Sequence, residues 1–382
     1  MKRLLFVILA IFTAIISVGG VKKASAEQLD IKSKSAILMD ANTKTIVYSH
    51  AENERRPIAS MTKIMLLNLC FESVKKGELS LDEEIRVSKN ASGMGGSQVF
   101  LEENGSYKAR DLIKSVIIAS ANDASVALAE RLYGSEADCV SAMNKKCEEW
   151  GLKDTLFSNC TGLPKPTQYS SANDVAMMLC NLITYDEYFK YSSVWMDEIE
   201  HSKGRVTGLT NTNKLIKFYY GCDGGKTGFT SEAGFCLGAT AKRGNLRLVA
   251  VVISAIDSKT RFGDISQMFN YGFDNYASKM VVDSSKPLDI KVKVDKSKVG
   301  EVQVVASQDV FVFGKRNQKE NISIDFEPYD ICAPIKKGDA VGKLKIFKDN
   351  LEYKCVEVIS AQDIAEKTYF DYIVDIGKNW TF

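Results

Sequence analysis

The spacing of apolar residues changes along this chain, and each change marks a predicted shift in architecture. Two short apolar runs at 36–39 and 45–48 flank a turn, which predicts a β-hairpin. Helical spacing then predicts helices at about 59–74, 109–119, 122–133, 136–150 and 172–184. From Gly225 the spacing predicts strands, at 235–241 and 246–253, and then a helix at about 260–278. Strands on both sides of a helical block predict an α/β (α+β) domain with helices packed on an antiparallel sheet.

The pattern of apolar and polar residues changes again after Met280. Apolar and polar residues alternate at 288–294, 302–305, 310–313 and 322–326, which predicts a small all-β domain over 284–360. The last segment, 361–382, carries Tyr369, Ile373, Ile376 and Trp380 at helical spacing. Such an amphipathic helix either lies in a membrane interface or packs on the β domain.

The N-terminus has the pattern of an export signal. Lys2 and Arg3 precede an apolar run at 4–18, and Ala24-Ser-Ala26 follows. This order is typical of a secretory signal peptide, here 1–26, and the alternative is an uncleaved membrane anchor. Both interpretations place the rest of the chain, beginning with a domain at 27–280, outside the cytoplasm.

Composition excludes some classes of function. The 382 residues are 45% hydrophobic and 26% charged with a net charge of +2, and no basic stripe is interleaved with aromatic residues, so nothing favours nucleic-acid binding. Nine cysteines and two histidines include no C-x-x-C pair, which disfavours a zinc site. Because several cysteines lie in apolar runs, we expect mostly buried thiols rather than a disulfide framework.

Three short motifs in a fixed order carry the candidate chemistry. They are Ser60-Met-Thr-Lys63, Ser120-Ala-Asn122 and Lys226-Thr-Gly228. Together they indicate acyl transfer by a serine nucleophile with a lysine base. A Ser-His-Asp triad has little material here, because the histidines are only His50 and His201.

The S-x-x-K pattern also occurs at Ser73, on the same predicted helix. Ser60 lies near the N-terminus of this helix, where free backbone N–H groups and the positive end of the dipole favour an oxyanion and a neutral lysine. Ser73 lies in the last turn, where lysines serve as ordinary C-terminal caps. The three-residue spacing puts Lys63 on the face of Ser60, so we choose Ser60.

The other two motifs have simpler interpretations as well. Ser88 and Ser171 also begin S-x-N triplets, and Ser171 is best explained as a helix N-cap because Asp174 follows three residues later. Ser120 could equally be a cap. The glycines around Lys226 could form only a turn, or they could permit a strand edge to approach the nucleophile and hold a peptide by main-chain hydrogen bonds.

The order of these motifs resembles the penicillin-binding proteins and serine β-lactamases, in particular the low-molecular-mass D-alanyl-D-alanine carboxypeptidases. The stretches that carry the resemblance are Arg56-Pro-Ile-Ala-Ser-Met-Thr-Lys63, Ser120-Ala-Asn-Asp-Ala-Ser-Val-Ala-Leu-Ala-Glu130 and Lys226-Thr-Gly-Phe-Thr-Ser-Glu-Ala-Gly-Phe235. The likeness runs from about 30 to 280. The order of signal peptide, catalytic domain, β domain and amphipathic tail is also similar to that family.

The resemblance implies a role for each site residue. Ser60 would attack the penultimate D-alanine carbonyl, Lys63 would be the general base, and Ser120 would relay a proton to the leaving amine. A second ammonium at Lys226, with partial burial, would depress the pKa of Lys63. The remaining residues would bind the substrate. Asn122 would hold the substrate amide, and the backbone N–H groups of Ser60 and Phe229 would form the oxyanion hole. The terminal carboxylate would be bound by Thr227, Thr230 and Arg261, with Gly228 beside them.

The implied partners are a peptidoglycan stem peptide ending in D-Ala-D-Ala and β-lactam antibiotics as covalent inhibitors, with no metal or organic cofactor. The E-x-x-L-N stretch of class A β-lactamases is missing between Ser120 and Lys226, which favours slow release of penicillin. Three alternatives use the same site: an endopeptidase or transpeptidase, a β-lactamase, and a non-catalytic wall-binding scaffold.

Overall fold

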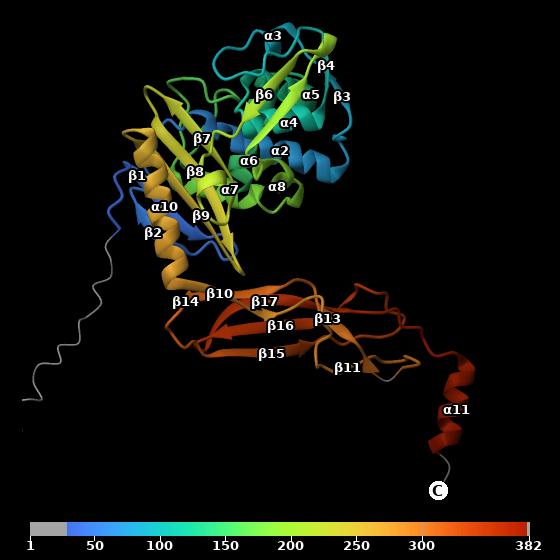
Figure 1. Cartoon of the computed structure of the whole chain (residues 1–382). Coiled ribbons are helices and arrows are strands. Elements are labelled where there is room, and N and C mark those ends of the chain that lie inside the picture. The colour runs from blue at the N-terminus through green and yellow to red at the C-terminus, as the bar shows by residue number, and fades with distance from the viewer. Residues whose placement is uncertain (1–28, 300, 380–382) are drawn as a thin grey trace, which may run out of the picture. The chain divides into compact units, whose positions relative to one another are not determined.

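The computed structural model describes residues 29–299 and 301–379 (Figure 1). The predicted signal peptide and Trp380 therefore lie outside the described residues. Within them, no helix is long and apolar enough to cross a membrane.

A five-stranded antiparallel sheet organises the larger domain. Its strand order is β2-β1-β9-β8-β7, so β7 is an edge strand. The strands are β1 Ser35–Asp40, β2 Ile46–His50, β7 Cys222–Thr230, β8 Gly234–Arg243 and β9 Leu246–Ala255. The sequence predicted this arrangement of N-terminal and late strands in one antiparallel sheet, and it is confirmed.

Helices cover the sheet and build a second layer (Figure 1). Helix α10 packs on β8 and β9, and α7 also packs on β9 and β1. The helices are α2 Lys63–Lys76, α3 Lys89–Ser92, α4 Ala109–Ile118, α5 Asn122–Tyr133, α6 Glu136–Glu149, α7 Ala172–Leu182, α8 Asp186–Ser192, α9 Leu215–Phe218 and α10 Ser258–Asn275. Short elements complete the domain: η1 Ala59–Thr62, η2 Ser202–Gly204, and the hairpins β3 Glu84–Arg86 with β4 Ser106–Lys108 and β5 Met196–Glu200 with β6 Val206–Thr210.

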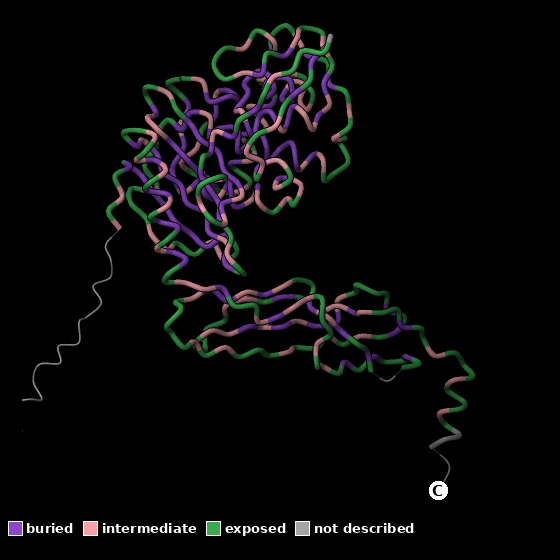
Figure 2. Tube along the Cα trace, viewed as in Figure 1, coloured by how far each residue is buried: buried purple, intermediate pink, exposed green. Residues whose placement is uncertain are grey.

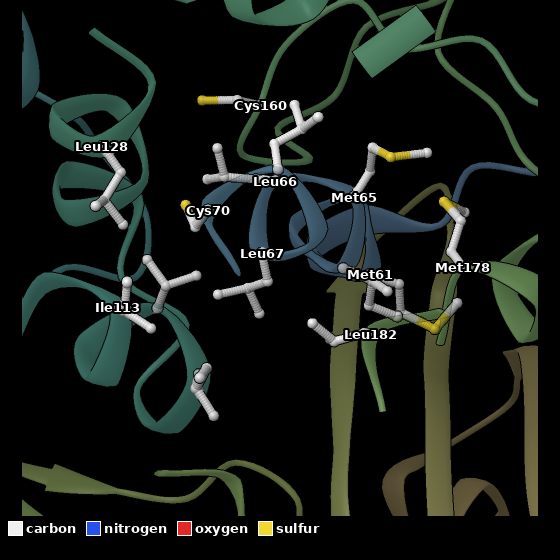
Figure 3. Close-up of a cluster of buried hydrophobic side chains, with 14 of the residues drawn as sticks. Met61, Met65, Leu66, Leu67, Cys70, Ile113, Leu128, Cys160, Met178 and Leu182 are labelled. Carbon is white, nitrogen blue, oxygen red and sulfur yellow. The ribbon is translucent and has the colours of Figure 1, made fainter. Parts of the chain in front are cut away.

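Helix α2 is the centre of the core. Ten of its residues are buried, from Lys63 to Ser73, so it is apolar on nearly every side, as expected of a helix enclosed by other elements. Figure 3 shows its side chains pointing toward Leu128 and Ile113 on one side and toward Met178 on the other. The buried positions around α2 form one large cluster (Figure 2). All nine cysteines are free thiols and seven are buried, which confirms the predicted buried thiols.

The C-terminal part is all-β, as predicted. Its elements are β10 Tyr276–Val282, β11 Val292–Lys293, β12 Glu301–Val302, β13 Val304–Ala306, β14 Val310–Lys315, β15 Ile322–Pro328, β16 Ala340–Lys348 and β17 Leu351–Ser360. Four of them form a sheet of order β13-β17-β16-β15, and β10 pairs with β14. A separate cluster of buried valine and isoleucine side chains forms the core. Helix α11 Tyr369–Asn379 follows.

Three predicted elements differ from the structure. The helix expected at 59–74 begins as the 3-10 turn η1. The helix expected to reach 278 ends at Asn275, because Tyr276 becomes extended, pairs with Lys315 and stacks its ring on Phe313 with 5.1 Å between the centroids. The strand expected at 288–294 pairs only at Val292–Lys293.

Ser171 shows how local sequence sets a helix boundary. Its hydroxyl accepts a hydrogen bond from the backbone N–H of Asp174 at 3.1 Å, which confirms the predicted N-cap of α7. We expect Ser171→Ala to lower the free energy of unfolding by about 1 kcal/mol, because one helix donor loses its acceptor. Urea unfolding measures this loss. Ser141→Ala, in the middle of exposed α6, is the control, and an equal effect of both substitutions would contradict the capping role.

Candidate active site

Ser60 and Lys63 meet at the junction of η1 and α2. Lys63 Nζ lies 3.1 Å from Ser60 Oγ. In a 3-10 turn residues three apart are eclipsed, so the local geometry itself stacks Lys63 over Ser60. The residue before Ser60, Ala59, has a φ of 46°, which a non-glycine residue rarely adopts. Backbone strain of this kind concentrates at functional sites.

The amine of Lys63 is enclosed and fully satisfied. Its side chain is 0% exposed, and Nζ donates to Asn122 Oδ1 at 2.7 Å and to the Thr161 carbonyl at 2.5 Å. Burial lowers the pKa of Lys63 to about 7. A neutral amine has two hydrogens and one lone pair. The two acceptors take the hydrogens, so the lone pair faces Ser60 Oγ and can accept its proton.

The second motif, Ser120-Ala-Asn122, lies beside the Lys63 amine at the start of α5. Asn122 is the first residue of α5; its backbone N–H donates to Ser97 O and its Nδ2 to Gly95 O, both at 2.7 Å. Ser120, just before the helix, is buried and has a φ of 63°. The N-cap position of α5 is Ala121 and no side chain caps the helix, so the interpretation of Ser120 as a cap is wrong.

The third motif lies inside the edge strand β7. Lys226 is buried and its Nζ donates to the Thr227 carbonyl at 3.0 Å. Burial first, and then the charges of Lys63 and Arg261, lower the pKa of Lys226. Burial is therefore the main cause for both lysines. Of the two causes expected for Lys63, a second ammonium and partial burial, burial is the one that lowers its pKa.

Glycine lets β7 approach the nucleophile. A Cβ added to Gly228 would lie 2.5 Å from the Ile58 carbonyl oxygen and 3.2 Å from the Ser60 backbone nitrogen. Any side chain there would force the strand and the 3-10 turn apart. Because Gly224, Gly225 and Gly228 all lie within β7, the interpretation of these glycines as only a turn is wrong.

The remaining candidates lie along β7 and α10. Thr227 Oγ1 donates to Thr212 Oγ1 at 2.8 Å, and Thr230 Oγ1 accepts from the Ala233 N–H at 3.0 Å. Phe229 is 56% exposed and its ring lies 4.4 Å from that of Phe235.

Arg261 is buried rather than solvated, in contrast to an ordinary arginine early in a helix. Its Nη1 donates to the carbonyls of Gly228 and Cys236, each at 3.3 Å. Burial lowers the pKa of Arg261 to about 10, so the guanidinium keeps its charge at neutral pH.

Sequence reasoning missed three contributors. Thr161 supplies a carbonyl to Lys63, and Gly162, with a φ of +83°, presses against Ala59 and Ser60. Asp123 accepts hydrogen bonds from the N–H groups of Val99 and Leu101 and so holds the 95–101 loop against Asn122. An Asn-x-x-Gly turn signal at 159–162 was present in the sequence, but its position beside Lys63 was not. Among residues 29–299 and 301–379, no cluster of His, Cys, Asp or Glu forms a metal site.

Comparison with known families decides the class. Residues 22–257 match the family model described as D-alanyl-D-alanine carboxypeptidase, and 276–366 match the C-terminal domain of penicillin-binding protein 5. The chain belongs to the D-alanyl-D-alanine carboxypeptidase family of serine peptidases. Helix α10 with Arg261 lies just beyond the first matched range, so this arginine has less support from the family model than the three motifs have.

Individual relatives agree along the chain. The protein is 37% identical over 356 residues to D-alanyl-D-alanine carboxypeptidase DacF of Bacillus subtilis, covering 93% of this chain and 91% of the relative. It is similar to the crystal structure of penicillin-binding protein 5 from Haemophilus influenzae, with a TM-score of 0.69, 28% identity and coverage of 88% and 98%. It is also similar to the crystal structure of a peptidoglycan synthesis regulatory factor (PBP3) from Streptococcus pneumoniae, with a TM-score of 0.70 and 26% identity. That match covers 87% of this chain and 99% of the other. The predicted fold class and family are confirmed.

The lowered pKa of Lys63 predicts a pH dependence of acylation by a fluorescent penicillin. Below about 7 the amine is protonated and cannot accept the Ser60 proton, so the rate should fall about tenfold per pH unit. Above about 7 it should level off, because the amine is already neutral. Stopped-flow measurement between pH 5 and 9 tests this. A pH–rate profile that falls only below the ordinary lysine pKa, or one that is flat, would contradict the lowered pKa of Lys63.

Proposed function

We propose that this protein is an exported serine carboxypeptidase that removes the terminal D-alanine from peptidoglycan stem pentapeptides through a Ser60 acyl-enzyme. The observation that carries the proposal is the place of the Lys63 amine, whose Nζ lies 3.1 Å from Ser60 Oγ, 2.7 Å from Asn122 Oδ1 and 2.5 Å from the Thr161 carbonyl oxygen. An unpaired ammonium buried at this place would be costly.

Each step of the reaction uses a group at the site. Lys63 takes the hydroxyl proton as Ser60 Oγ bonds to the carbonyl carbon of the penultimate D-alanine. The tetrahedral intermediate collapses, the C–N bond breaks, and Ser120 relays the proton from Lys63 to the leaving D-alanine amine, which returns Lys63 to its neutral form. Water then attacks the ester, Lys63 again accepts a proton, and the shortened peptide leaves as a carboxylic acid while Ser60 regains its hydrogen.

Binding roles follow from the surroundings of β7. The N–H groups of Ser60 and Phe229 form the oxyanion hole, a role supported by the close approach of Gly228 to the Ser60 nitrogen. The positive charge of Arg261, with the hydroxyls of Thr227 and Thr230, receives the terminal carboxylate, and Lys226 lies on the same strand.

The peptide itself joins the edge of β7 by main-chain hydrogen bonds, beside Asn122. Asn122 Nδ2 carries a second hydrogen beyond the one that it donates to Gly95, and this hydrogen is suited to a substrate carbonyl.

The same site would react with β-lactams and release them slowly, because the glutamate that activates water in class A β-lactamases has no counterpart motif here. The competing activities are endopeptidase or transpeptidase, β-lactamase, and a wall-binding scaffold without catalysis. The match of residues 22–257 to the carboxypeptidase family, followed by a penicillin-binding protein 5 C-terminal domain at 276–366, favours the first proposal over these three.

The order of the segments supports a place at the outer face of the cell membrane or at the cell wall. The segments are the signal peptide 1–26, the catalytic domain 27–280, the β domain 284–360 and the tail 361–382. We propose that the tail binds the membrane interface through α11. Its side chains Tyr369, Phe370, Ile373 and Ile376 are 77%, 77%, 47% and 58% exposed. Because these apolar side chains are not covered, a membrane interface can take them up.

Labelling tests the nucleophile. A fluorescent penicillin should label the wild type covalently and should not label Ser60→Ala, because the attacking oxygen is gone. Ser73→Ala, which removes the serine of the second S-x-x-K pattern on the same helix, is the matched control and should label normally. Equal labelling of Ser60→Ala and wild type would remove this nucleophile.

Release of D-alanine from a soluble pentapeptide separates the carboxypeptidase from its rivals. Labelling without D-alanine release would favour the scaffold, and rapid penicillin turnover would favour a β-lactamase.

The tail is tested by membrane fractionation. Removing 361–382, or substituting Ile373→Asp with Ile376→Asp, should move the protein from membranes to the soluble fraction, because the apolar face is lost or charged. Activity on a soluble pentapeptide should remain. An unchanged distribution of the truncated protein would count against anchoring.

A further inference from the structure

The turn at 159–163 presents a carbonyl to the base. Thr161 O accepts from Lys63 Nζ at 2.5 Å, and the N–H of the same peptide unit, on Gly162, donates to Asn159 Oδ1 at 2.7 Å. A peptide unit is planar and its C=O and N–H point in opposite directions. Fixing the N–H of Gly162 therefore fixes the direction of the carbonyl that holds Lys63.

Asn159 is well suited to fix this plane. Its side chain is buried, and Oδ1 also accepts from the backbone N–H and the hydroxyl of Thr161, each at 3.2 Å. On the other side of the amide, Nδ2 donates to Leu163 O at 2.8 Å. Gln168 Oε1 in turn accepts from the Ser158 and Asn159 N–H groups, both at 3.0 Å. Turning the Asn159 amide would break several hydrogen bonds inside the protein.

The same turn touches the backbone of the nucleophile. A Cβ on Gly162 would lie 2.1 Å from the Ala59 carbonyl oxygen and 2.8 Å from the Ser60 nitrogen. One peptide plane thus bridges Asn159 and Lys63 while its α-carbon rests on the strained segment that carries Ser60. Small rotations of this plane would change the direction of the Lys63 lone pair relative to Ser60 Oγ.

We infer that Asn159 is a positioning residue for acylation: its side-chain amide orients the Thr161–Gly162 peptide so that Lys63 directs its lone pair at Ser60. The inference rests on the proposed Ser60–Lys63 chemistry and adds a residue outside the three motifs. Asn159 does not touch the reacting atoms, so its effect reaches them through the Thr161–Gly162 peptide. The substrate does not need to contact it.

Two variants and a matched control test this inference. Asn159→Ala frees the peptide plane and should slow acylation by a fluorescent penicillin about 100-fold, the cost of a misplaced catalytic group. Asn144→Ala is the control, since its amide tethers the same segment through Phe157 N (2.8 Å) and Phe157 O (2.9 Å) without contacting the Thr161–Gly162 peptide. It should acylate at the wild-type rate.

Asn159→Asp keeps the oxygen acceptors and adds a negative charge near Lys63. A negative charge favours the ammonium form and raises the pKa of Lys63, so the acid limb of the pH–rate profile should move to higher pH. At high pH this variant should recover acylation that Asn159→Ala does not. A simple loss of folded protein would lower the active fraction at every pH, and high pH would not restore acylation.

Three results would overturn the inference: wild-type acylation by Asn159→Ala, equal slowing by Asn144→Ala, or no recovery of acylation by Asn159→Asp at high pH. If Asn159→Ala does not fold, the acylation rate of Asn159→Asp at high pH decides alone. D-alanine release by the wild type is measured separately. Its absence, with penicillin acylation intact, would defeat the carboxypeptidase proposal and leave the role of Asn159 standing.

Discussion

The burial of one amine is the constraint on which the site depends. A lysine ammonium enclosed by protein is costly, and the protein escapes this cost by lowering the pKa of Lys63 until the neutral form is accessible. The enclosure exists because α2 is surrounded by other helices and the sheet. The two hydrogen-bond acceptors of the Lys63 amine, on Asn122 and Thr161, lie 59 and 98 residues further along the chain. A base at neutral pH is therefore a property of the assembled core.

The second constraint is steric. The edge strand β7 must lie close enough to the 3-10 turn to share the substrate with Ser60, and glycine at 228 removes the side chain that would prevent it. Gly162, in the turn at 159–163, allows an equally close approach. The strained Ala59–Ser60 segment is thus approached by two glycines from distant parts of the sequence. Rigid placement of this kind lets interactions at the site act without reorganisation during the reaction.

Much of the fold could be predicted from periodicity. Helices α4 to α7 and strands β1, β8 and β9 lie close to their predicted ranges, because each buries a face whose spacing is visible in the sequence. The errors occur where contacts distant in sequence decide. The strand β10 replaces the expected end of a helix because Tyr276 finds a pairing partner in Lys315. The short hairpin β5–β6 and helix α8 were not predicted, since so few residues carry little periodic signal.

The sequence by itself determined the order of the three motifs, the spacing of Ser60 and Lys63, and the glycines that a close approach requires. These are local or compositional properties, and local geometry expresses them directly. Only the tertiary structure decided that the Lys63 amine loses its solvent, that the Thr161 carbonyl accepts a hydrogen bond from it, and that Arg261 is buried against Gly228. Each of these depends on which distant segments pack together, and no short stretch of sequence encodes that by itself.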